Sequence, residues 1–480
     1  MSKKTNVFKK FSRTFWLANS MELFERWAWY GVYMLLANYL TKSTDLGGLG
    51  FSQESKAMIM SVGTSILYFL PIITGAIADR YGYKRILLLA FVIYSIGFIA
   101  MPYCRSFGSF FSIFIFVAIG GALFKPIITA TISKTTDDTT SSIGFGIYYW
   151  MVNVGAFIGP LVALHFSKIS YTFVFYLSAV FILINIPVLY FYKEPERKSL
   201  DISFKKSIVL VFKNIWVAIQ DYKFVVFLLI VAGFWSMYYQ LFYTLPVFIH
   251  QWVDTSLLYD YLEKVFPWLI EKIGSPDRTI AAEYITNIDA MYIILFQILV
   301  STIIMKWKPL TSMVTGFFVC SIGMSLTLFT NNPFFILVSI FIFGLGEMAG
   351  SPKITEYIGK IAPKDKIALY MGCAFLPVTL GSFLAGYISG GVYGRMADKV
   401  TLLQKDLVLK NISVPELSDS FTQTDLFNKA GELMNMTQQE LTNYLWNTYH
   451  PNRIWIIILF IGVFASLLLF VYDKFLVRDN

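Results

Sequence analysis

Long apolar segments recur along the whole chain, and short polar loops separate most of them. Each segment is at least about 18 residues long, enough for a helix to cross a hydrocarbon core roughly 30 Å thick. Backbone groups in lipid must form hydrogen bonds within their own segment, and the alternating polarity of β-barrel strands is missing from the sequence. With 56% hydrophobic and 14% charged residues, the chain is also more apolar than an average soluble domain. The sequence therefore predicts an all-α membrane protein.

The apolar segments predict twelve membrane-spanning helices, six in each half of the chain. The first six form an N-terminal bundle over residues 15–192, and the last six form a C-terminal bundle over residues 223–473. The predicted spans are 15–40, 54–78, 86–104, 111–133, 142–165, 171–192, 223–249, 286–305, 310–330, 334–359, 367–393 and 452–473.

Lysine and arginine residues gather in loops that the predicted spans bring to one side of the membrane. These loops include the N-terminal tail 1–14, the linker 193–222 and residues 79–85. The positive-inside bias makes this side cytoplasmic, so both the N-terminal tail and the C-terminal tail 474–480 are expected in the cytoplasm. The net charge of +9 thus reflects membrane topology and does not indicate nucleic-acid binding. We expect a multi-pass protein of a bacterial cell (inner) membrane.

Three stretches are too polar to span the membrane. The linker 193–222 has a second half that alternates apolar and basic residues in a helical manner, which predicts a helix on the cytoplasmic membrane surface. The insertions 250–285 and 394–451 are expected to project outward. Segments 256–273 and 423–446 within them have the pattern of short amphipathic helices.

An internal repeat relates the two halves. Residues 121–134 align without gaps on residues 347–360, and the same offset of 226 brings residues 154–159 onto 380–385. The fourth and fifth spans are therefore repeated as the tenth and eleventh. Two parallel halves of this kind resemble the major facilitator architecture, which places the substrate site between the halves near the midplane.

Ionisable side chains inside predicted spans are expensive to bury, so each is a candidate for function. In the first span, Glu22, Glu25 and Arg26 lie on one helical face, and Glu22 and Arg26 are spaced to pair. The fourth span contributes Lys125. The tenth span contributes Glu347, Lys353 and Glu356.

The first of these groups predicts proton coupling, because carboxylates beside cations in a low-dielectric cavity titrate together. A proton on Glu22 or Glu25 would release Arg26 or Lys125 to hold a substrate carboxylate, and loss of the proton would restore the ion pair and expel the substrate. The alternative is a static salt-bridge network, which explains less because buried ion pairs often fail to repay their desolvation. For the pair of Lys353 and Glu356 the static alternative is equally good.

The sequence contains no motif typical of a metal-binding protein, an enzyme or an ATP-driven transporter. Three cysteines without CxxC spacing and only three histidines argue against a metal site. The chain has no nucleophile elbow, HExxH motif or Walker loop. We therefore expect no enzyme activity, no cofactor and no ATP drive, with the proton gradient as the energy source. A transporter-fold sensor or membrane enzyme is the alternative from another class, and the retained charges argue against a sensor.

Residues 22–31, ELFERWAWYG, resemble the ExxERFxYYG signature of the proton-dependent oligopeptide transporter (POT/PTR) family of the major facilitator superfamily. Further blocks follow in order. Residues 75–85 match the superfamily loop between spans two and three, and later segments are similar to the FKP, FYxxINxGA, FWxxxxQ and GExxxSP blocks, at 124–126, 148–156, 234–240 and 346–352. An ordered set is more specific than any single motif.

The resemblance implies a role for each matching residue. Arg26 and Lys125 would bind the carboxylate of the substrate, and Asn153 and Glu347 would bind its amino end. Glu22 and Glu25 would carry or relay the coupled proton. Arg26 and Lys125 would take part in the coupling as the cations that the protonated acids release. The further residues expected to bind substrate are Tyr30, Tyr33, Tyr68, Trp235, Tyr239 and Asp289. The conformational loop motif comprises Gly75, Asp79, Arg80, Gly82, Lys84 and Arg85.

Four positions depart from the family pattern. Tyr33 stands where a basic residue is usual and Tyr239 where an acid is usual, so two tyrosines that could still contact each other replace one ion pair. Asp289 stands where the family tends to have asparagine, near the expected amine subsite. Ala374 stands where a tryptophan is usual. The pocket is therefore expected to be less cationic, more acidic at one end and roomier than the family norm.

The implied function is proton-driven import of di- or tripeptides by alternating access, carried out by a monomer that is embedded in lipid. The departures keep a second possibility open, in which the same mechanism carries another small amphoteric or anionic compound, such as an amino acid derivative or nitrogenous metabolite. Asp289 either selects a substrate with a strongly cationic end or is itself a second proton site. The sequence does not distinguish these alternatives.

Overall fold

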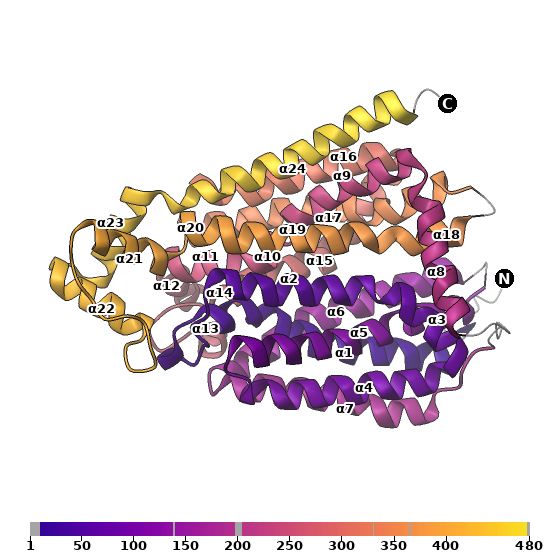
Figure 1. Cartoon of the computed structure of the whole chain (residues 1–480), viewed down its shortest axis with the longest axis horizontal. Coiled ribbons are helices and arrows are strands. Elements are labelled where there is room, and N and C mark those ends of the chain that lie inside the picture. The colour runs from indigo at the N-terminus through magenta and orange to yellow at the C-terminus, as the bar shows by residue number, and fades with distance from the viewer. Residues whose placement is uncertain (1–9, 138–139, 197–203, 330, 364–365, 478–480) are drawn as a thin grey trace. The chain divides into compact units, whose positions relative to one another are not determined.

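The computed structural model describes residues 10–137, 140–196, 204–329, 331–363 and 366–477. Most of the predicted N-terminal tail, the middle of the linker 193–222 and the end of the C-terminal tail lie outside these residues. Figure 1 shows that the described residues are helical along almost their whole length.

The chain forms two compact units. Unit 1 comprises the chain up to Val32 together with Gly63–Val226 and Ile358–Thr379, and unit 2 comprises Tyr33–Val62, Phe227–Tyr357 and the chain from Leu380 onward. The first two spans therefore contribute to both units. The division into two six-helix bundles remains a prediction from the sequence.

The helices account for the predicted spans. Ten helices in the described part of the chain are long and apolar enough to cross a membrane, and the bent pair α2 (Gln53–Phe69) and α3 (Pro71–Tyr81) makes an eleventh span. Helix α1 (Arg13–Thr41) is 29 residues long and carries charged residues in its middle, so adding it gives the twelve predicted spans. The ten helices lie in or around α4 (Tyr83–Ala100), α5 (Phe107–Lys134), α6 (Ser141–Ser167), α7 (Tyr171–Phe191), α9 (Tyr222–Tyr238), α15 (Ile288–Ile304), α16 (Pro309–Ser325), α17 (Pro333–Ile361), α19 (Leu376–Tyr387) and α24 (Ile454–Val471).

Three spans are interrupted, and a proline stands at the break in two of them. Pro71 follows the 45° bend between α2 and α3. The seventh span continues from α9 into α10 (Gln240–Tyr243) and α11 (Leu245–Trp252), which begins with a proline at its second position. The eleventh span begins with α18 (Ile367–Gly372), and after α19 it passes through a π-helical turn, Ile388–Val392, into α20 (Tyr393–Met396).

The two polar insertions fold as short helices. The first contains α12 (Ser256–Val265), α13 (Pro267–Ile273) and α14 (Ala282–Thr286), and the second contains α21 (Lys399–Leu409), α22 (Gln423–Met434) and α23 (Gln438–Tyr449). Capping boxes begin α22 and α23, where the side chains of Thr422 and Thr437 accept the backbone N–H groups of Asp425 and Glu440. The predicted amphipathic helices in segments 256–273 and 423–446 are therefore present.

The linker forms α8 (Phe204–Ile219), which packs against α3 and α18 within unit 1 (Figure 1). Its apolar side chains Val209, Phe212 and Trp216 are exposed. An exposed apolar face on a helix of a membrane protein is suited to the membrane surface, as the sequence predicts.

Glycines at equivalent positions of the internal repeat bring helices into close contact. A Cβ atom on Gly155 of α6 would lie 2.7 Å from Arg26 Cβ and 2.8 Å from the carbonyl oxygen of Leu23 on α1. In unit 2, a Cβ atom on Gly381 of α19 would lie 2.7 Å from the carbonyl oxygen of Ala232 on α9. Small residues allow this approach of helix backbones in membranes, so equivalent positions of the repeat give a tightly packed helix pair in each unit.

Substitution of Gly155 by alanine tests this packing. Gly155→Ala should lower the midpoint of thermal unfolding in detergent, because overpacking a close helix contact costs about 1–3 kcal/mol. Gly146→Ala on the same helix is the matched control, since a Cβ atom there would meet no atom within 4 Å. Equal unfolding midpoints for the two variants would contradict the close approach of α1 and α6.

Candidate functional site

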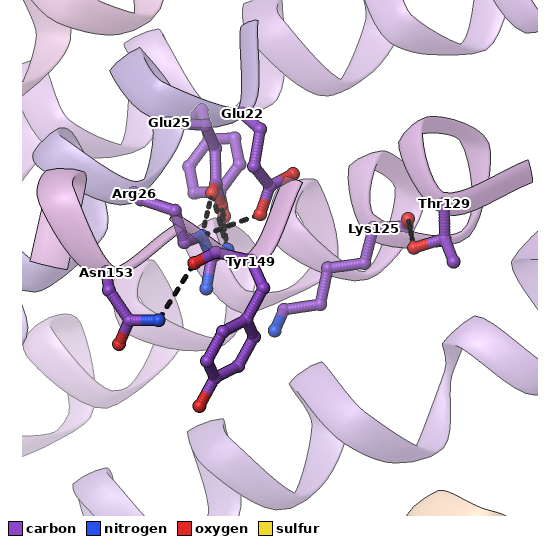
Figure 2. A network of polar contacts seen from close by, with 8 residues as sticks. Glu22, Glu25, Arg26, Lys125, Thr129, Tyr149 and Asn153 are labelled. Carbon is purple, nitrogen blue, oxygen red and sulfur yellow. Dashed lines mark hydrogen bonds and ion pairs between the residues drawn. The ribbon is translucent and has the colours of Figure 1, made fainter. Parts of the chain in front are cut away.

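The predicted charged group of the first span lies buried in unit 1. Glu22, Glu25 and Arg26 are 2%, 0% and 2% exposed. Arg26 Nη2 donates to Glu25 Oε1 at 2.7 Å, and Arg26 Nε lies 3.3 Å from Glu22 Oε1. Figure 2 shows the guanidinium group between the two carboxylates. The i, i+4 spacing has therefore produced the predicted ion pair, and Glu25 adds a second carboxylate to the same cation.

Tyrosine side chains from two other helices lie near the carboxylates. Tyr94 on α4 donates to Glu25 Oε1 at 2.5 Å, and Tyr148 on α6 lies near Glu22. Glu22 Oε2 is buried without a hydrogen-bond partner among the described residues. Glu25 is thus held by a cation and a hydroxyl group, whereas Glu22 keeps one acceptor oxygen open.

Lys125 lies on α5, next to Pro126, which stands inside that helix. Its Nζ atom is 4.5 Å from the centre of the Tyr68 ring of α2, a cation–π contact. In the part of the chain that the structure describes, no carboxylate lies within ion-pair distance of Lys125. The charge of Lys125 nevertheless interacts electrostatically with Glu22. The ammonium group therefore has an aromatic neighbour and, among the described residues, no direct acidic partner. Figure 2 shows no dashed line from Lys125 to Glu22 or Glu25.

Unit 1 contains two further predicted residues, Tyr30 and Asn153. Tyr30, one helical turn after Arg26, has its ring centre 5.7 Å from the guanidinium carbon. Asn153 on α6 donates its side-chain amide to the carbonyl oxygen of Tyr149 at 2.8 Å (Figure 2). This bond within the helix occupies an amide donor and leaves the side-chain oxygen of Asn153 as the acceptor.

Of the residues predicted around the amino end of the substrate, Asp289 and Glu347 lie in unit 2 and Asn153 lies in unit 1. Asp289 on α15 and Glu347 on α17 are 5% and 9% exposed. Asp289 Oδ1 lies 2.9 Å from the position that a Cβ atom on Gly344 would take, one turn before Glu347. Tyr238 of α9 donates its hydroxyl group to Glu347 Oε1 at 2.9 Å. Trp235, one turn earlier on α9, packs edge-on against Tyr238 with ring centres 4.8 Å apart.

The two tyrosines that replace the expected ion pair meet a third tyrosine. Tyr33 and Tyr239 are both buried in unit 2. The hydroxyl group of Tyr33 donates to that of Tyr243 at 3.4 Å, and the ring of Tyr239 lies 5.5 Å from the Tyr243 ring. Tyr243 also shares a hydrogen bond of 2.9 Å with Ser382 Oγ. The sequence did not identify Tyr243, which lies one turn beyond the family motif.

The residues predicted from the sequence also did not include one buried lysine, Lys56. Lys56 of α2 is fully buried in unit 2, where its ammonium group donates to the carbonyl oxygen of Tyr243 at 2.7 Å, Ser389 Oγ at 2.7 Å and Gln53 Oε1 at 2.8 Å. The Gln53 amide in turn donates to Asp398 Oδ1 at 2.8 Å. We call Gln53, Lys56, Tyr243 and Ser389 the Lys56 network. Lys56 stands within the predicted second span, so the rule that selected Lys125 would also have selected it.

The conformational loop motif lies at the junction of α3 and α4. Gly82 has a φ angle of +104°, a conformation that favours glycine and separates the two helices. Tyr83 donates to Asp79 Oδ1 at 2.8 Å, and the backbone N–H of Lys84 donates to Glu194 Oε1 at 2.8 Å. The loop is thereby tied to the beginning of the linker. Helix α3 also carries Gly75 and Arg80, and the first turn of α4 carries Arg85.

The described residues contain no group of three or more His, Cys, Asp or Glu side chains that could hold a metal ion.

Comparison with known proteins assigns the fold to a family. The family model described as the Major Facilitator Superfamily matches residues 19–386. The chain belongs to this superfamily. As a superfamily member with ten or eleven apolar helices among its described residues, it is a multi-pass membrane protein.

Curated relatives of this superfamily member match over part of their length. It is 32% identical over 144 residues to the uncharacterized transporter YclF of Bacillus subtilis, covering 29% of each chain. It is 31% identical over 189 residues to dipeptide and tripeptide permease A of Cronobacter turicensis, covering 38% of this chain and 36% of the relative. The matches thus span about a third of these relatives. They confirm the resemblance to peptide transporters of the POT family.

Solved structures match over almost the whole superfamily member. A POT family transporter in complex with 5-aminolevulinic acid has a TM-score of 0.70 at 18% identity, covering 96% of both chains. A peptide transporter POT in complex with sulfate has a TM-score of 0.70 at 17% identity, covering 97% of this chain and 94% of that one. At this level of identity the likeness concerns the fold.

Arg26 and Lys125 should differ in their contribution to stability. Arg26→Ala removes the cation between two buried carboxylates, and breaking a buried ion pair costs about 3–5 kcal/mol. Lys125→Ala removes a cation–π contact worth about 1 kcal/mol. Thermal unfolding of the purified protein at neutral pH should therefore show a much larger decrease for Arg26→Ala. This decrease should shrink as the pH is lowered, because protonation removes the uncompensated charges. Equal effects of the two variants would contradict the observed pairing.

The Lys56 network should stabilise unit 2. Lys56→Met takes the ammonium donor away from Gln53 Oε1 and from Ser389 Oγ, at a cost of about 1–3 kcal/mol. The carbonyl oxygen of Tyr243 keeps the Ser389 hydroxyl as a donor at 2.9 Å. The unfolding midpoint should decrease accordingly. Lys264→Met is the matched control, since Lys264 is exposed on α12 of the same unit. An unchanged midpoint for Lys56→Met would show that the network contributes nothing.

Proposed function

We propose that the chain is a proton-coupled secondary transporter, a symporter that imports di- and tripeptides by alternating access. The observation that carries this proposal is the Glu22–Glu25–Arg26 group together with Lys125, which lacks a direct carboxylate partner among the described residues. A static network would pair its charges completely. A carrier needs a cation that is free to hold a substrate carboxylate and acids that can take up a proton.

The coupling would follow from competition for Arg26. In the structure, Arg26 is engaged by both Glu22 and Glu25. A proton on Glu22 removes one of its two partners, and a proton on Glu25 removes the bidentate one, so that the guanidinium group becomes available to a substrate carboxylate. Lys125 would bind the same carboxylate as a second cation. Loss of the proton restores the ion pairs, and the substrate loses its binding partners.

The amino end of the substrate would bind in unit 2. Glu347 has an oxygen without a hydrogen-bond partner among the described residues, and Tyr238 holds its other oxygen in place. Curated relatives that carry names such as di-/tripeptide transporter, from Lactococcus lactis, support peptides as the substrate class. The carrier would work as a monomer in the bacterial inner membrane with both termini in the cytoplasm. It would use the proton gradient, without a cofactor, enzyme activity or nucleic-acid partner.

A second candidate substrate is a small amphoteric compound such as an amino acid derivative. The extra carboxyl group of Asp289 beside Glu347 favours it, because this end of the site is more acidic than a peptide amino group requires. A POT family transporter has been solved in complex with 5-aminolevulinic acid, a compound of this class.

Uptake into proteoliposomes under an imposed inward proton gradient tests the proposal. Dipeptides should accumulate only with the gradient, and Glu25→Gln and Lys125→Ala should each reduce uptake at least about tenfold, the effect of about 1.4 kcal/mol on a transport step. Glu263→Gln and Lys264→Ala, both on α12, are the matched controls and should transport normally. Full uptake by Glu25→Gln and Lys125→Ala would refute the assigned roles. Gradient-driven uptake of 5-aminolevulinic acid without transport of any dipeptide would favour the second substrate class.

A further inference from the structure

Two carboxyl groups of unit 2 are buried close together. Asp289 and Glu347 come from α15 and α17, and each is more than nine-tenths buried. Asp289 Oδ1 lies 2.9 Å from the position that a Cβ atom on Gly344 would take, one turn before Glu347 on the same helix, and the two carboxyl groups interact. A hydrogen bond between two carboxyl groups requires a proton, because an ionised carboxylate has no donor.

The surroundings of this pair are neutral. Tyr238 of α9 donates to Glu347 Oε1, and the other titratable groups that face the pair are Tyr292 of α15 and Cys320 of α16. In the described part of the chain, no lysine or arginine interacts with either carboxyl group. Two adjacent negative charges at low dielectric cannot both persist without a cation. One proton shared between the two groups therefore gives the pair a single negative charge.

One oxygen of each carboxyl group receives no donor from the protein. Neither Asp289 Oδ1 nor Glu347 Oε2, both buried, accepts a hydrogen bond from an N–H or O–H group of the described residues. Buried acceptors without donors are costly, so the pair is suited to a ligand that brings donors. An ammonium group brings three donors and one positive charge.

We infer that the Asp289–Glu347 pair is a proton-exchange site, which releases its shared proton to water when it binds a primary ammonium group of the substrate. Before binding, one carboxylate and one carboxylic acid carry a total charge of −1. After binding, two carboxylates and one ammonium group again carry −1. The charge of the buried site is therefore unchanged, and one proton leaves for each amino group bound. The inference rests on the proposed function in assuming that the substrate has an amino group. The proton carried inward in the symport is the one assigned to Glu22 and Glu25, because a proton released at binding does not travel with the substrate.

Asp289 is the residue that makes the exchange possible. The related family tends to have asparagine at this position, and an amide cannot hold the second negative charge. Asp289→Asn would convert the pair to a single carboxylate, which could bind an ammonium group without releasing a proton. This resolves the two alternatives for Asp289 in one mechanism, since the same carboxyl group holds a proton in the empty site and a cation in the occupied one.

Infrared spectroscopy of the purified full-length protein tests the shared proton without any substrate. The C=O stretching band of a protonated carboxyl group should be present at neutral pH, and it should be lost or shifted in both Asp289→Asn and Glu347→Gln, because one proton belongs to both residues. Asp260→Asn is the control, since Asp260 is an exposed carboxylate paired with Arg278. A band that persists unchanged in Asp289→Asn or in Glu347→Gln would overturn the proposal.

The exchange itself is tested with n-propylammonium chloride as the probe. Adding it to the wild-type protein should diminish the same band, whereas n-propanol and sodium chloride at equal concentrations should not. A band that survives saturating n-propylammonium, or that n-propanol diminishes equally, would overturn the exchange. Because this probe is not a peptide, the result is independent of the uptake experiment. Failure to transport dipeptides would thus count against the proposed function and not against the proton-exchange site.

Discussion

The cost of burying charge in an apolar interior governs the chemistry of this molecule. An unpaired ion inside a membrane protein must find a partner, lose its charge or reach water. Arg26 finds two carboxylates, Lys56 finds neutral oxygen atoms, and Asp289 and Glu347 find only each other. The three arrangements differ in whether a charged group can exchange its present partner for another one. In the proposed transport cycle, the first would exchange an acid for a substrate carboxylate. The second offers Lys56 only neutral acceptors, and the third lacks a cation among the described residues.

The internal repeat provides one framework for two different binding environments. Gly155 and Gly381 occupy equivalent positions and allow the same close approach of α6 to α1 and of α19 to α9. The side chains beside these contacts differ, however. The first pair positions Arg26 among carboxylates, whereas the second packs against the aromatic side chain of Trp235. A shared backbone arrangement therefore fixes where side chains can reach, and the individual residues decide which charge each unit accepts.

The sequence predicted the features that depend on local spacing. Apolar length gave the spans, and the i, i+4 spacing gave the pair of Glu22 and Arg26. Features that depend on distant partners were beyond it, because Lys56 is bonded to Ser389 across 333 residues, through a π-helical turn with no simple sequence signal. The partner of Tyr33 is also set by a helix break, since the seventh span restarts at Thr244 and brings Tyr243 to its hydroxyl group. The predicted division into two six-helix bundles and the roles of the site residues remain predictions.

The composition of the Lys56 network determines how its hydrogen bonds respond when the pH falls. Its ammonium group is held by an amide oxygen, two carbonyl oxygens and a hydroxyl group, none of which takes up a proton in the physiological range. A carboxylate in their place would be neutralised as the medium acidified, and the contact would weaken when the proton supply was greatest. Neutral acceptors avoid this conflict. The direct contacts of Lys56 that attach α2 to α10 and to the π-helical turn therefore contain no acceptor that would take up the protons proposed to bind Glu22 and Glu25.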